Sequence, residues 1–284
     1  MSNLIDGKKI SENVKQRVAD EVAELKKKGL SVGLAVVIVG DNAASRVYVN
    51  NKKKACERCG ITSFEYALSD QTTERELLDL VEKLNNDEKV NGILVQLPLP
   101  KQIDEHRVLE AISPKKDVDA FHAVNVGKIM IGDFDFLPCT PSGCMELIDS
   151  TGVEISGKNC VVIGRSNIVG KPMAMLLLHR NGTVTICHSK TQNLKDICKT
   201  ADILVAAVGR AHFVTADMVK PGAVVIDVGM NRLENGKLCG DVDFEAVKDV
   251  AGYITPVPGG VGPMTIATLM QNTVTAAKIH NGIQ

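Results

Sequence analysis

The first half of the chain contains a tyrosine and a lysine whose types and spacing could form a catalytic pair. Tyr48 and Lys52 are four residues apart within residues 43–60, so a helix would place both on one face. Lysine is one of the residue types that act as general acids or bases, and tyrosine offers a flat ring. Such a pair also arises by chance, so alone it is only a candidate catalytic pair. Lys53 and Lys54 would point elsewhere, toward solvent.

A glutamine and two aspartates stand where such a site would need polar groups. Gln96 follows the apolar run at 92–95, at the expected carboxyl end of a strand, where ligands bind in open α/β sheets. It is either a strand end that meets water or a hydrogen-bonding residue of a site. Asp117 and Asp119 lie two apart in a stretch rich in turn residues. They suit either an Asx-type turn or a carboxylate that binds a cationic or guanidine-like group of a ligand.

The second half of the chain contains a candidate dinucleotide site. An apolar run at 159–163 leads into Gly164, Arg165 and Ser166, and a helical pattern follows from Gly170. A glycine turn between a strand and a helix lets the backbone approach a pyrophosphate, and the helix N-terminus supplies N–H groups and a positive dipole end. The spacing departs from the standard fingerprint, because Ser166 replaces the second glycine and the next glycine comes one residue late. An ordinary strand-to-helix turn is the alternative.

The next apolar run, 183–187, bears on the choice between NAD and NADP. An NAD site usually carries an acidic residue at this strand end to hold the ribose 2′-hydroxyl. Here the chain continues with His188, Ser189, Lys190 and Thr191, and no acid is present. Hydroxyls and a cation would suit a 2′-phosphate, with Arg165 as a second cation. The sequence therefore favours NADP, although His188 and Lys190 also fit a plain solvated surface.

Short apolar runs alternate with amphipathic segments, and this order predicts the elements that position these residues. The runs are rich in Val and Ile at successive positions, which is typical of parallel strands buried on both faces. Segments such as 73–85 and 171–180 are long enough for crossover helices, and a final helix is expected over 264–280. The βαβ pattern occurs twice, so the fold class is α/β with two domains, the second a Rossmann-like doubly wound parallel sheet. The expected strands lie within 33–40, 62–68, 92–98, 159–164, 183–187, 202–209 and 223–229.

Composition excludes several classes of protein. The formal net charge of -1, the aromatic content of 3 % and the absence of tryptophan argue against a nucleic-acid partner. No run is long enough to span a bilayer, and no signal peptide is expected, so we predict a cytoplasmic protein without a membrane partner. The eight cysteines are expected to be free thiols. Cys56 and Cys59 form a CxxC on a helical pattern, where packing is favoured over redox chemistry, and no metal site is predicted.

Long motifs spread over nearly the whole chain resemble one family, bifunctional methylenetetrahydrofolate dehydrogenase/methenyltetrahydrofolate cyclohydrolase. The match keeps the family's order. Two departures are visible, because Ala120 stands where the family usually has glycine and Ala123 where proline is common. The motifs are ASRVYVNNKKKACERCGI, ILVQLPLP, KDVDAFHAVNVG, PCTPSG, GRSNIVGKP, CHSKT, VIDVGMNR and TPVPGGVGPMT.

The resemblance implies an enzyme of one-carbon metabolism that oxidises 5,10-methylenetetrahydrofolate with NADP and then hydrolyses the methenyl product to 10-formyltetrahydrofolate. It implies a folate-binding catalytic domain of residues 1–120 plus 264–284, an NADP-binding domain of residues 121–263, and a folate cleft between them. A homodimer is also implied. Carried over by motif, the catalytic residues are Tyr48, Lys52 and Gln96, and the substrate-binding residues are Tyr48, Asp119, Pro258, Gly259 and Gly260. The cofactor-binding residues are Gly164, Arg165, Ser166, Ser189 and Met230.

The residue types fit the implied chemistry. The pterin edge donates hydrogen bonds that Asp119 could accept, and Tyr48 could lie beside the fused rings. The cationic methenyl product would lower the pKa of a nearby Lys52, which could then move protons near neutral pH, with Gln96 holding it in place. Hydride transfer needs mainly the correct geometry of the two ligands.

Three alternatives remain open on sequence alone. A short-chain dehydrogenase also uses a Tyr-x-x-x-Lys pair, but its glycine turn precedes that pair, whereas here Gly164 follows Tyr48 by more than 100 residues. A monofunctional dehydrogenase would not need Lys52 and Gln96. A non-enzymatic dinucleotide-sensing module would leave the whole candidate catalytic set idle.

Overall fold

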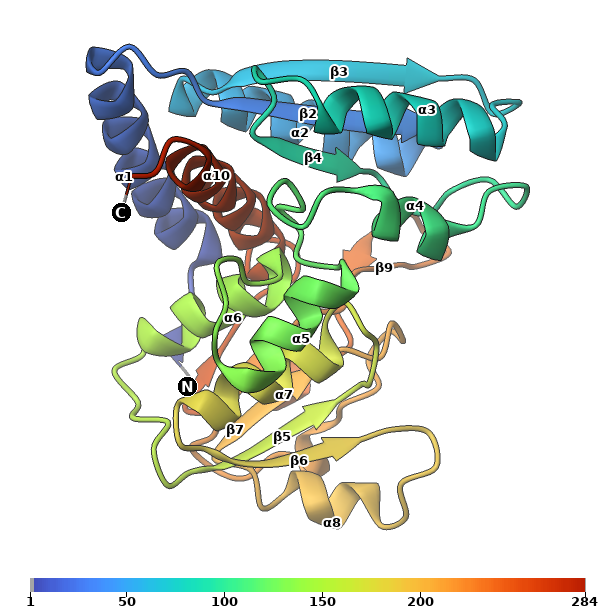
Figure 1. The fold of residues 1–284 in the computed structure, drawn as a ribbon. Helices are drawn as coiled ribbons and strands as arrows, with labels where there is room; N and C mark the ends of the chain where they lie inside the picture. Colours follow the sequence, from blue (N-terminus) through green and yellow to red (C-terminus); the bar gives the residue numbers. More distant parts are fainter. Residues whose placement is uncertain (1–2, 284) are drawn as a thin grey trace. The chain divides into compact units, whose positions relative to one another are not determined.

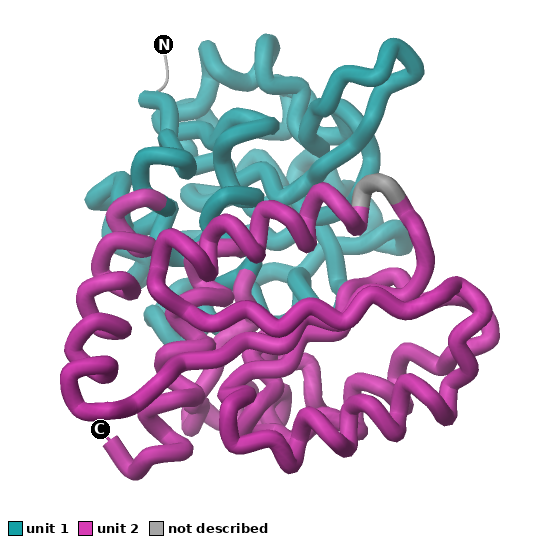
Figure 2. The backbone as a smooth tube through the Cα atoms, turned by 90° about the horizontal axis from the view of Figure 1, so that it is seen from above, with its two compact units in different colours: residues 1–11, 140–265 teal, residues 12–139, 266–284 magenta. Residues whose placement is uncertain are grey.

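A computed structural model describes residues 3–283, with the backbone alone at residues 43 and 44 (Figure 1). The chain divides into two compact units (Figure 2). Glu12–Cys139 and Ile266–Gln284 make up one, here called the three-stranded unit, and the residues up to Ser11 together with Thr140–Thr265 make up the other, the six-stranded unit. The predicted division at residues 120 and 264 differs from these units at three places, because the residues up to Ser11, residues 121–139 and residues 264–265 belong to the opposite unit.

A parallel sheet in the order β3-β2-β4 forms the centre of the three-stranded unit. Strand β2 (Gly33–Val39) lies in the middle and is buried at every residue, as its unbroken apolar run predicts. Strand β3 (Thr62–Leu68) is the partly exposed edge, and β4 (Gly92–Val95) is buried. The helices that lie wholly within this unit are α2 (Ala43–Cys59), α3 (Glu74–Asn85), α4 (Glu105–Ala111) and α5 (Ala123–Ile131).

Local signals explain where these helices begin. Helix α3 starts with a capping box, in which the Thr73 hydroxyl accepts a hydrogen bond from the Glu76 N–H and the Glu76 carboxylate accepts one from the Thr73 N–H. Asp104 caps α4 through its side chain. One face of α3 then packs on the sheet through Leu77, Val81 and Leu84.

The six-stranded unit has a wholly parallel sheet in the order β1-β11-β8-β7-β5-β6. Strands β5, β6, β7 and β8 follow one another along the chain, joined by helices or a 3₁₀ turn, and form a doubly wound core, which confirms the predicted α/β fold class. Strand β6 is an exposed edge. The bounds are β1 (Asn3–Leu4), β5 (Asn159–Ile163), β6 (Thr183–Cys187), β7 (Ile203–Ala206), β8 (Val224–Asp227) and β11 (Tyr253–Ile254), with α6 (Cys139–Asp149), α7 (Gly170–His179), α8 (Leu194–Cys198), a 3₁₀ turn (Ala216–Met218) and α9 (Phe244–Val247).

Some elements were not expected from the sequence. The strands β1 and β11 are two residues each, as are β9 (Asn231–Arg232) and β10 (Leu238–Cys239), which form an antiparallel hairpin. Residues 113–143, which are rich in turn residues and were expected to form turns, contain helix α5 and the start of helix α6. Helix α10 (Val261–His280) begins three residues earlier than expected, since Pro263 lies in its first turn, where a missing N–H has no cost. Helix α1 covers Gly7–Lys27.

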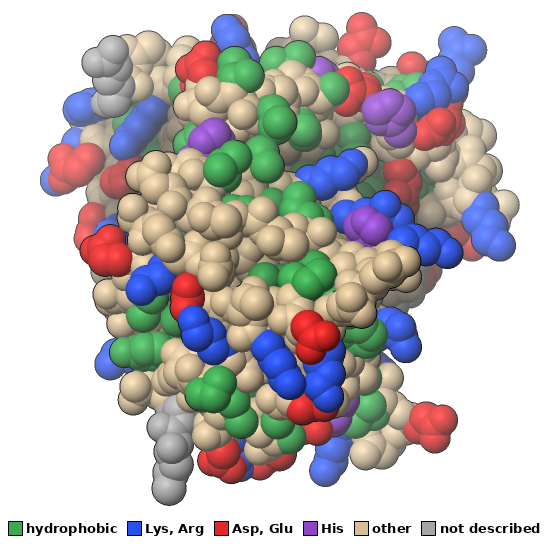
Figure 3. Space-filling model, turned by 90° about the horizontal axis from the view of Figure 1, so that it is seen from below, with side chains coloured by type: hydrophobic (Ala, Val, Ile, Leu, Met, Phe, Trp, Pro, Cys, Tyr) green, Lys and Arg blue, Asp and Glu red, His purple; other side chains and the backbone are tan. Residues whose placement is uncertain are grey.

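The surface carries charges of both signs. Figure 3 shows basic and acidic side chains interspersed over the face that it draws, in keeping with the near-zero net charge. Among the helices of residues 3–283, none is long and apolar enough to cross a membrane.

Candidate active site

Lys52 is the buried member of three consecutive lysines. Its exposed fraction is 9 %, whereas Lys53 and Lys54 are exposed as expected. Helix α2 turns Lys52 toward the sheet together with Val49, Ala55 and Cys56, which are also buried. An ammonium group so placed needs a partner, and its Nζ donates a hydrogen bond of 2.9 Å to Oε1 of Gln96.

Gln96 is held at the carboxyl end of β4. Its backbone N–H donates to the Val37 carbonyl at 2.8 Å, which continues the pairing of β4 with β2. Its side-chain Nε2 donates to the Leu97 carbonyl at 2.7 Å. Because the amide nitrogen is engaged there, Oε1 faces Lys52. The suggested role of Gln96 in positioning Lys52 therefore matches the hydrogen bond in the structure.

Asp119 shares this environment. Burial lowers the pKa of Lys52, and the negative charge of Asp119 offsets part of that shift. Burial likewise raises the pKa of Asp119, while the positive charge of Lys52 opposes the increase. Tyr48 lies one helical turn before Lys52, is half-buried, and has a pKa raised by burial. The structure thus gathers Lys52, Gln96 and Asp119 and places Tyr48 on the same helix.

Two further residues support the Asp119 segment from distant parts of the chain. The Cys139 thiol donates to the Val118 carbonyl at 3.4 Å. The Asn272 amide, on α10, donates to the carbonyls of Val118 and Leu137, both at 2.8 Å. Nothing in the sequence pattern singled out Asn272, and Cys139 was visible only as part of the PCTPSG motif.

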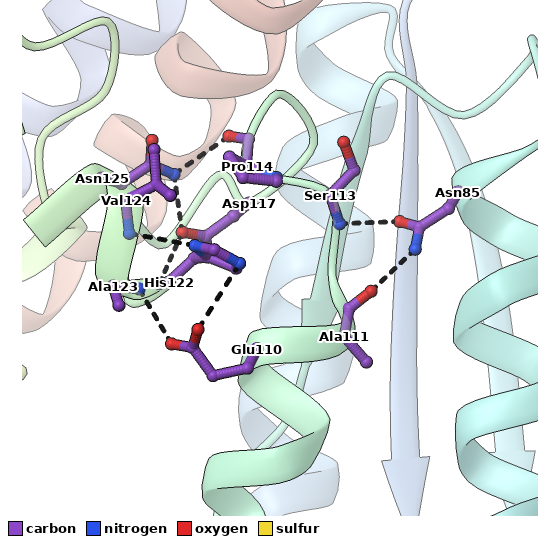
Figure 4. Close-up of polar contacts among 10 residues, drawn as sticks. All are labelled: Asn85, Glu110, Ala111, Ser113, Pro114, Asp117, His122, Ala123, Val124 and Asn125. Atoms are coloured by element: carbon purple, nitrogen blue, oxygen red, sulfur yellow. Dashed lines mark hydrogen bonds and ion pairs between the residues drawn. The ribbon is translucent and has the colours of Figure 1, made fainter.

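The loop that carries Asp119 is fixed by the buried carboxylate of Asp117. Oδ2 of Asp117 accepts hydrogen bonds from the His122 backbone at 2.9 Å and from the Asn125 side chain at 2.8 Å (Figure 4). Asn125 also donates to the Pro114 carbonyl at 2.9 Å. Asp117 therefore holds the loop through residues five and eight positions later, which is a structural role but not the Asx turn that the sequence offered. The charge of Lys52 acts on Asp119 instead.

The two departures from the family pattern lie in this loop. Ala120 is fully buried and has a φ of 57°, a left-handed conformation that favours glycine. The Ala123 N–H donates a 2.8 Å hydrogen bond to the Glu110 carboxylate (Figure 4), which a proline at this position could not form. His122 caps α5, because its Nδ1 accepts from the Val124 N–H at 3.1 Å.

The glycine turn of the six-stranded unit requires its glycines. Gly164 has a φ of 135°, and a Cβ there would lie 2.3 Å from the Ala207 carbonyl oxygen. A Cβ on Gly170 would lie 2.3 Å from the Gly164 carbonyl oxygen. Ser166, in the place of the second glycine, accepts hydrogen bonds from the N–H groups of Val169 and Gly170 at 3.2 and 3.3 Å. Its hydroxyl thus accepts from two N–H groups at the start of α7, and its proton remains available to donate to a ligand.

A pocket of about 450 Å³ lies at the carboxyl ends of β5, β6 and β7. Gly164, Arg165 and Ser189 line it, as the sequence predicted for the cofactor, whereas Ser166 and Met230 do not. The other polar residues that line the pocket are His188, Thr191 and Arg210, and none of the described lining residues is acidic. Nδ1 of His188 accepts from the Lys190 N–H, so in the neutral ring Nε2 carries the proton. The pocket is therefore suited to an anionic group.

Met230 and the Pro/Gly loop lie elsewhere in the six-stranded unit. Met230 is 43 % exposed after β8, and its Cε would be 3.4 Å from a Cβ at Gly262. Pro258 is exposed, whereas Gly260 is buried against the start of α1, where a Cβ on Gly7 would lie 1.9 Å from the Gly260 carbonyl oxygen. The Lys8 N–H donates to the Gly259 carbonyl at 3.1 Å. The N-terminal segment therefore fixes this loop.

The cysteines and acidic residues show no metal centre. All eight cysteines are free thiols, and burial raises the pKa of Cys56 to about 12. Sγ of Cys56 lies 3.6 Å from the Met270 sulfur, and Cys59 donates to the Lys15 carbonyl at 3.5 Å. No group of three potential ligand residues that could hold a metal ion occurs within residues 3–283.

Two family models match the chain. The model described as tetrahydrofolate dehydrogenase/cyclohydrolase, catalytic domain, matches residues 5–119. The model described as tetrahydrofolate dehydrogenase/cyclohydrolase, NAD(P)-binding domain, matches residues 138–281. The first match includes Tyr48, Lys52, Gln96 and Asp119, and the second includes the glycine turn and the 450 Å³ pocket.

Individual proteins match over nearly their full length. The bifunctional protein FolD of Acetivibrio thermocellus is 65 % identical over 279 residues, covering 98 % of both chains. The crystal structure of the bifunctional dehydrogenase/cyclohydrolase FolD from Campylobacter jejuni is 50 % identical with a TM-score of 0.96, covering 99 % of this chain and 100 % of that one. The Trypanosoma brucei enzyme, solved with NADP cofactor and inhibitor, is 40 % identical with a TM-score of 0.95, covering 99 % and 98 %.

Proposed function

The chain belongs to the tetrahydrofolate dehydrogenase/cyclohydrolase family, and on that premise we propose how its own residues divide the two reactions. The enzyme oxidises 5,10-methylenetetrahydrofolate with NADP and hydrolyses the methenyl product to 10-formyltetrahydrofolate. The dehydrogenase step moves a hydride from the methylene carbon to NADP, and no side chain has to move a proton. The hydrolysis adds water to the methenyl carbon, opens the bond to N5 and releases one proton.

Lys52 is the proposed proton-transfer residue of the hydrolysis. A lysine in water is almost wholly protonated at neutral pH, so it is a poor base. Burial lowers the pKa of Lys52, and the cationic methenyl substrate would lower it further by repulsion of like charges. The neutral amine can then take a proton from the attacking water. The buried Lys52 with its 2.9 Å hydrogen bond to Gln96 is the observation that carries this proposal.

The other residues have binding roles in this account. Asp119 would accept hydrogen bonds from the amino-pyrimidinone edge of the pterin, and the ring of Tyr48 would lie beside it. The rigid loop at Pro258, Gly259 and Gly260 would contact folate as well. Its hydrogen bond to the α1 backbone supports a fixed rather than an adaptable surface.

The cofactor is proposed to bind along the carboxyl edge of the six-stranded sheet. Gly164 and the start of α7 suit the pyrophosphate, and Arg165 and Ser189 suit the 2′-phosphate. Ser166 and Met230 would contact other parts of the cofactor. In this division the three-stranded unit supplies the catalytic side chains, and the six-stranded unit binds NADP. The acid-free pocket supports NADP over NAD.

We further propose a homodimer in the cytoplasm. The edge strand β6 has a free hydrogen-bonding side, and Ile186 on it and Leu178 on α7 are exposed at 38 % and 50 %. Exposed edges and apolar side chains are commonly covered by a partner. Eight free thiols fit a reducing compartment. Light scattering on the purified protein tests the dimer, and a monomeric mass at micromolar concentration would refute it.

An absorbance assay tests the bifunctional assignment. Methylenetetrahydrofolate and NADP should give NADPH at 1:1 with substrate consumed, and added methenyltetrahydrofolate should lose its absorbance band faster than in buffer alone. NADPH formation without enzyme-dependent decay of the methenyl band would indicate a monofunctional dehydrogenase. Cofactor binding with neither activity would indicate a dinucleotide-sensing module.

A further inference from the structure

The pocket at the ends of β5, β6 and β7 contains a cation that the sequence motifs did not indicate. Two arginines line this pocket. Arg165 follows strand β5, and Arg210 follows strand β7. Neither arginine has an ion-pair partner within the part of the chain that the structure describes. Two unneutralised guanidinium groups around one acid-free pocket favour a doubly charged anion.

The backbone that carries Arg210 is fixed by a buried carboxylate. Oδ2 of Asp241 accepts hydrogen bonds from the N–H groups of Val208 and Gly209 at 2.6 and 2.9 Å, and Oδ1 accepts one from the Arg210 N–H at 2.9 Å. Asp241 is fully buried. Gly209 has a φ of 67°, which lets the chain reverse so that all three N–H groups meet one side chain. Asp241 therefore fixes the backbone of this loop up to and including Arg210.

The side chain of Arg210 is also oriented. Its guanidinium carbon lies 4.9 Å from the centre of the Phe213 ring, the geometry of a cation–π contact. Phe213 lines the same pocket. An arginine stacked on a ring keeps its N–H edge free, because stacking uses only the flat face. That edge remains available for two parallel hydrogen bonds to a phosphate.

We propose that Arg210 is a specificity-determining residue, which together with Arg165 binds the 2′-phosphate of NADP. Asp241 acts as its positioning residue, through the backbone. This inference rests on the proposed use of NADP and adds to it a second phosphate contact, from the loop after β7. In NAD sites an acidic residue usually stands at the end of the strand that corresponds to β6, and here Ser189 follows that strand instead.

Equilibrium binding of two nucleotide fragments tests the assignment. Adenosine 2′,5′-bisphosphate and 5′-AMP differ by the 2′-phosphate, and both can be titrated calorimetrically into the full-length protein. Arg210→Ala should weaken the bisphosphate by about 10- to 100-fold, the effect of one charge-assisted contact, and change 5′-AMP binding less than threefold. Arg210→Lys should retain part of the preference, since lysine keeps the charge but not the fork. Lys199→Ala removes an exposed charge outside the pocket and should leave both affinities unchanged.

The possible failures can be told apart. If Arg210→Ala weakened both fragments equally, Arg210 would pack on the adenosine rather than bind the phosphate, and the inference would be wrong. If it changed neither, while the parent protein still preferred the bisphosphate, NADP use would stand without Arg210. If the parent itself bound both fragments alike, the proposed NADP preference and this inference would fall together.

Discussion

Nζ of Lys52 lies 2.9 Å from Oε1 of Gln96, a side chain 44 positions later in the sequence. Lys52 lies on helix α2, and Gln96 directly follows the carboxyl end of strand β4. Since Gln96 is neutral, it can orient the amine without stabilising its charge as a carboxylate would. The pair is therefore built to hold a lysine in place while leaving it able to lose its proton.

Replacing Gln96 by glutamate should shift the pH profile of the hydrolysis. A carboxylate in this position favours the charged lysine and raises its pKa, so fewer molecules hold the neutral amine at a given pH. The pH at which the cyclohydrolase rate reaches half its maximum on the acid limb should move upward by about 1 unit or more. Gln71→Glu, at an exposed position of the same unit, is the matched control and should not move it.

Asp119→Asn should shift the same limb in the opposite direction. The charge of Asp119 raises the pKa of Lys52, so its removal leaves burial to lower that pKa further. The half-maximal pH of kcat for hydrolysis should therefore fall. The KM for folate should rise in both reactions, because the pterin contact is common to them. An unchanged KM would remove Asp119 from the site, and an upward shift of the limb would contradict the electrostatic coupling.

Gly7→Ala should destabilise the six-stranded unit. The added Cβ would lie 1.9 Å from the Gly260 carbonyl oxygen, and backbone atoms cannot move aside as a side chain can. We expect a loss of about 1–3 kcal/mol in the free energy of unfolding. Gly127→Ala is the control, since nothing lies within 4 Å of its Cβ and its helical position favours alanine. Urea unfolding measures both; equal stabilities would mean that the packing of Gly7 on Gly260 is wrong.

Asp227 should make stability depend on pH. Burial raises its pKa from the ordinary 3.8 to about 6, although three backbone N–H groups donate to it. Between these values the unfolded chain loses the proton first, so the folded state is progressively penalised as pH rises, by up to about 3 kcal/mol.

Asp227→Asn removes that penalty but loses acceptor contacts at every pH. The stability deficit of the variant relative to the parent should therefore shrink as the pH is raised from 4.5 to 7. Urea unfolding of the two proteins at several pH values measures the difference, in which the titrating groups that do not interact with Asp227 cancel. A deficit that stays constant over this range would show that Asp227 has an ordinary pKa when folded.

The sequence predicted the long, regular parts of the molecule well. Strands such as β2 and β5 were recognisable because parallel strands buried on both faces need unbroken apolar runs. Lys52 could be distinguished from Lys53 and Lys54 because the helical period places it with Tyr48. The two-residue strands β1 and β11 were not recognisable, since they are defined only by pairing with β8 and with each other.

The parts of the site that depend on distant contacts were also missed. Asn272 reaches Val118 across 154 positions, and Asp241 reaches the Arg210 loop across 31, with no local signal at either end. A similar limit applies to Ala123, whose N–H is used only because Glu110 lies opposite it. Such residues are selected by the tertiary fold, and neither periodicity nor local propensity encodes them.

Lys52→Met tests the central claim most directly. Methionine keeps an unbranched stem of similar length but cannot carry a proton, so packing should change little. Stopped-flow or steady-state absorbance would follow NADPH and the methenyl band together. Cyclohydrolase activity should fall by about 10² to 10⁴ or more, while some dehydrogenase activity persists and the methenyl intermediate accumulates. Hydrolysis at the parental rate, or loss of both activities in a folded protein, would contradict the assignment of the proton transfer to Lys52.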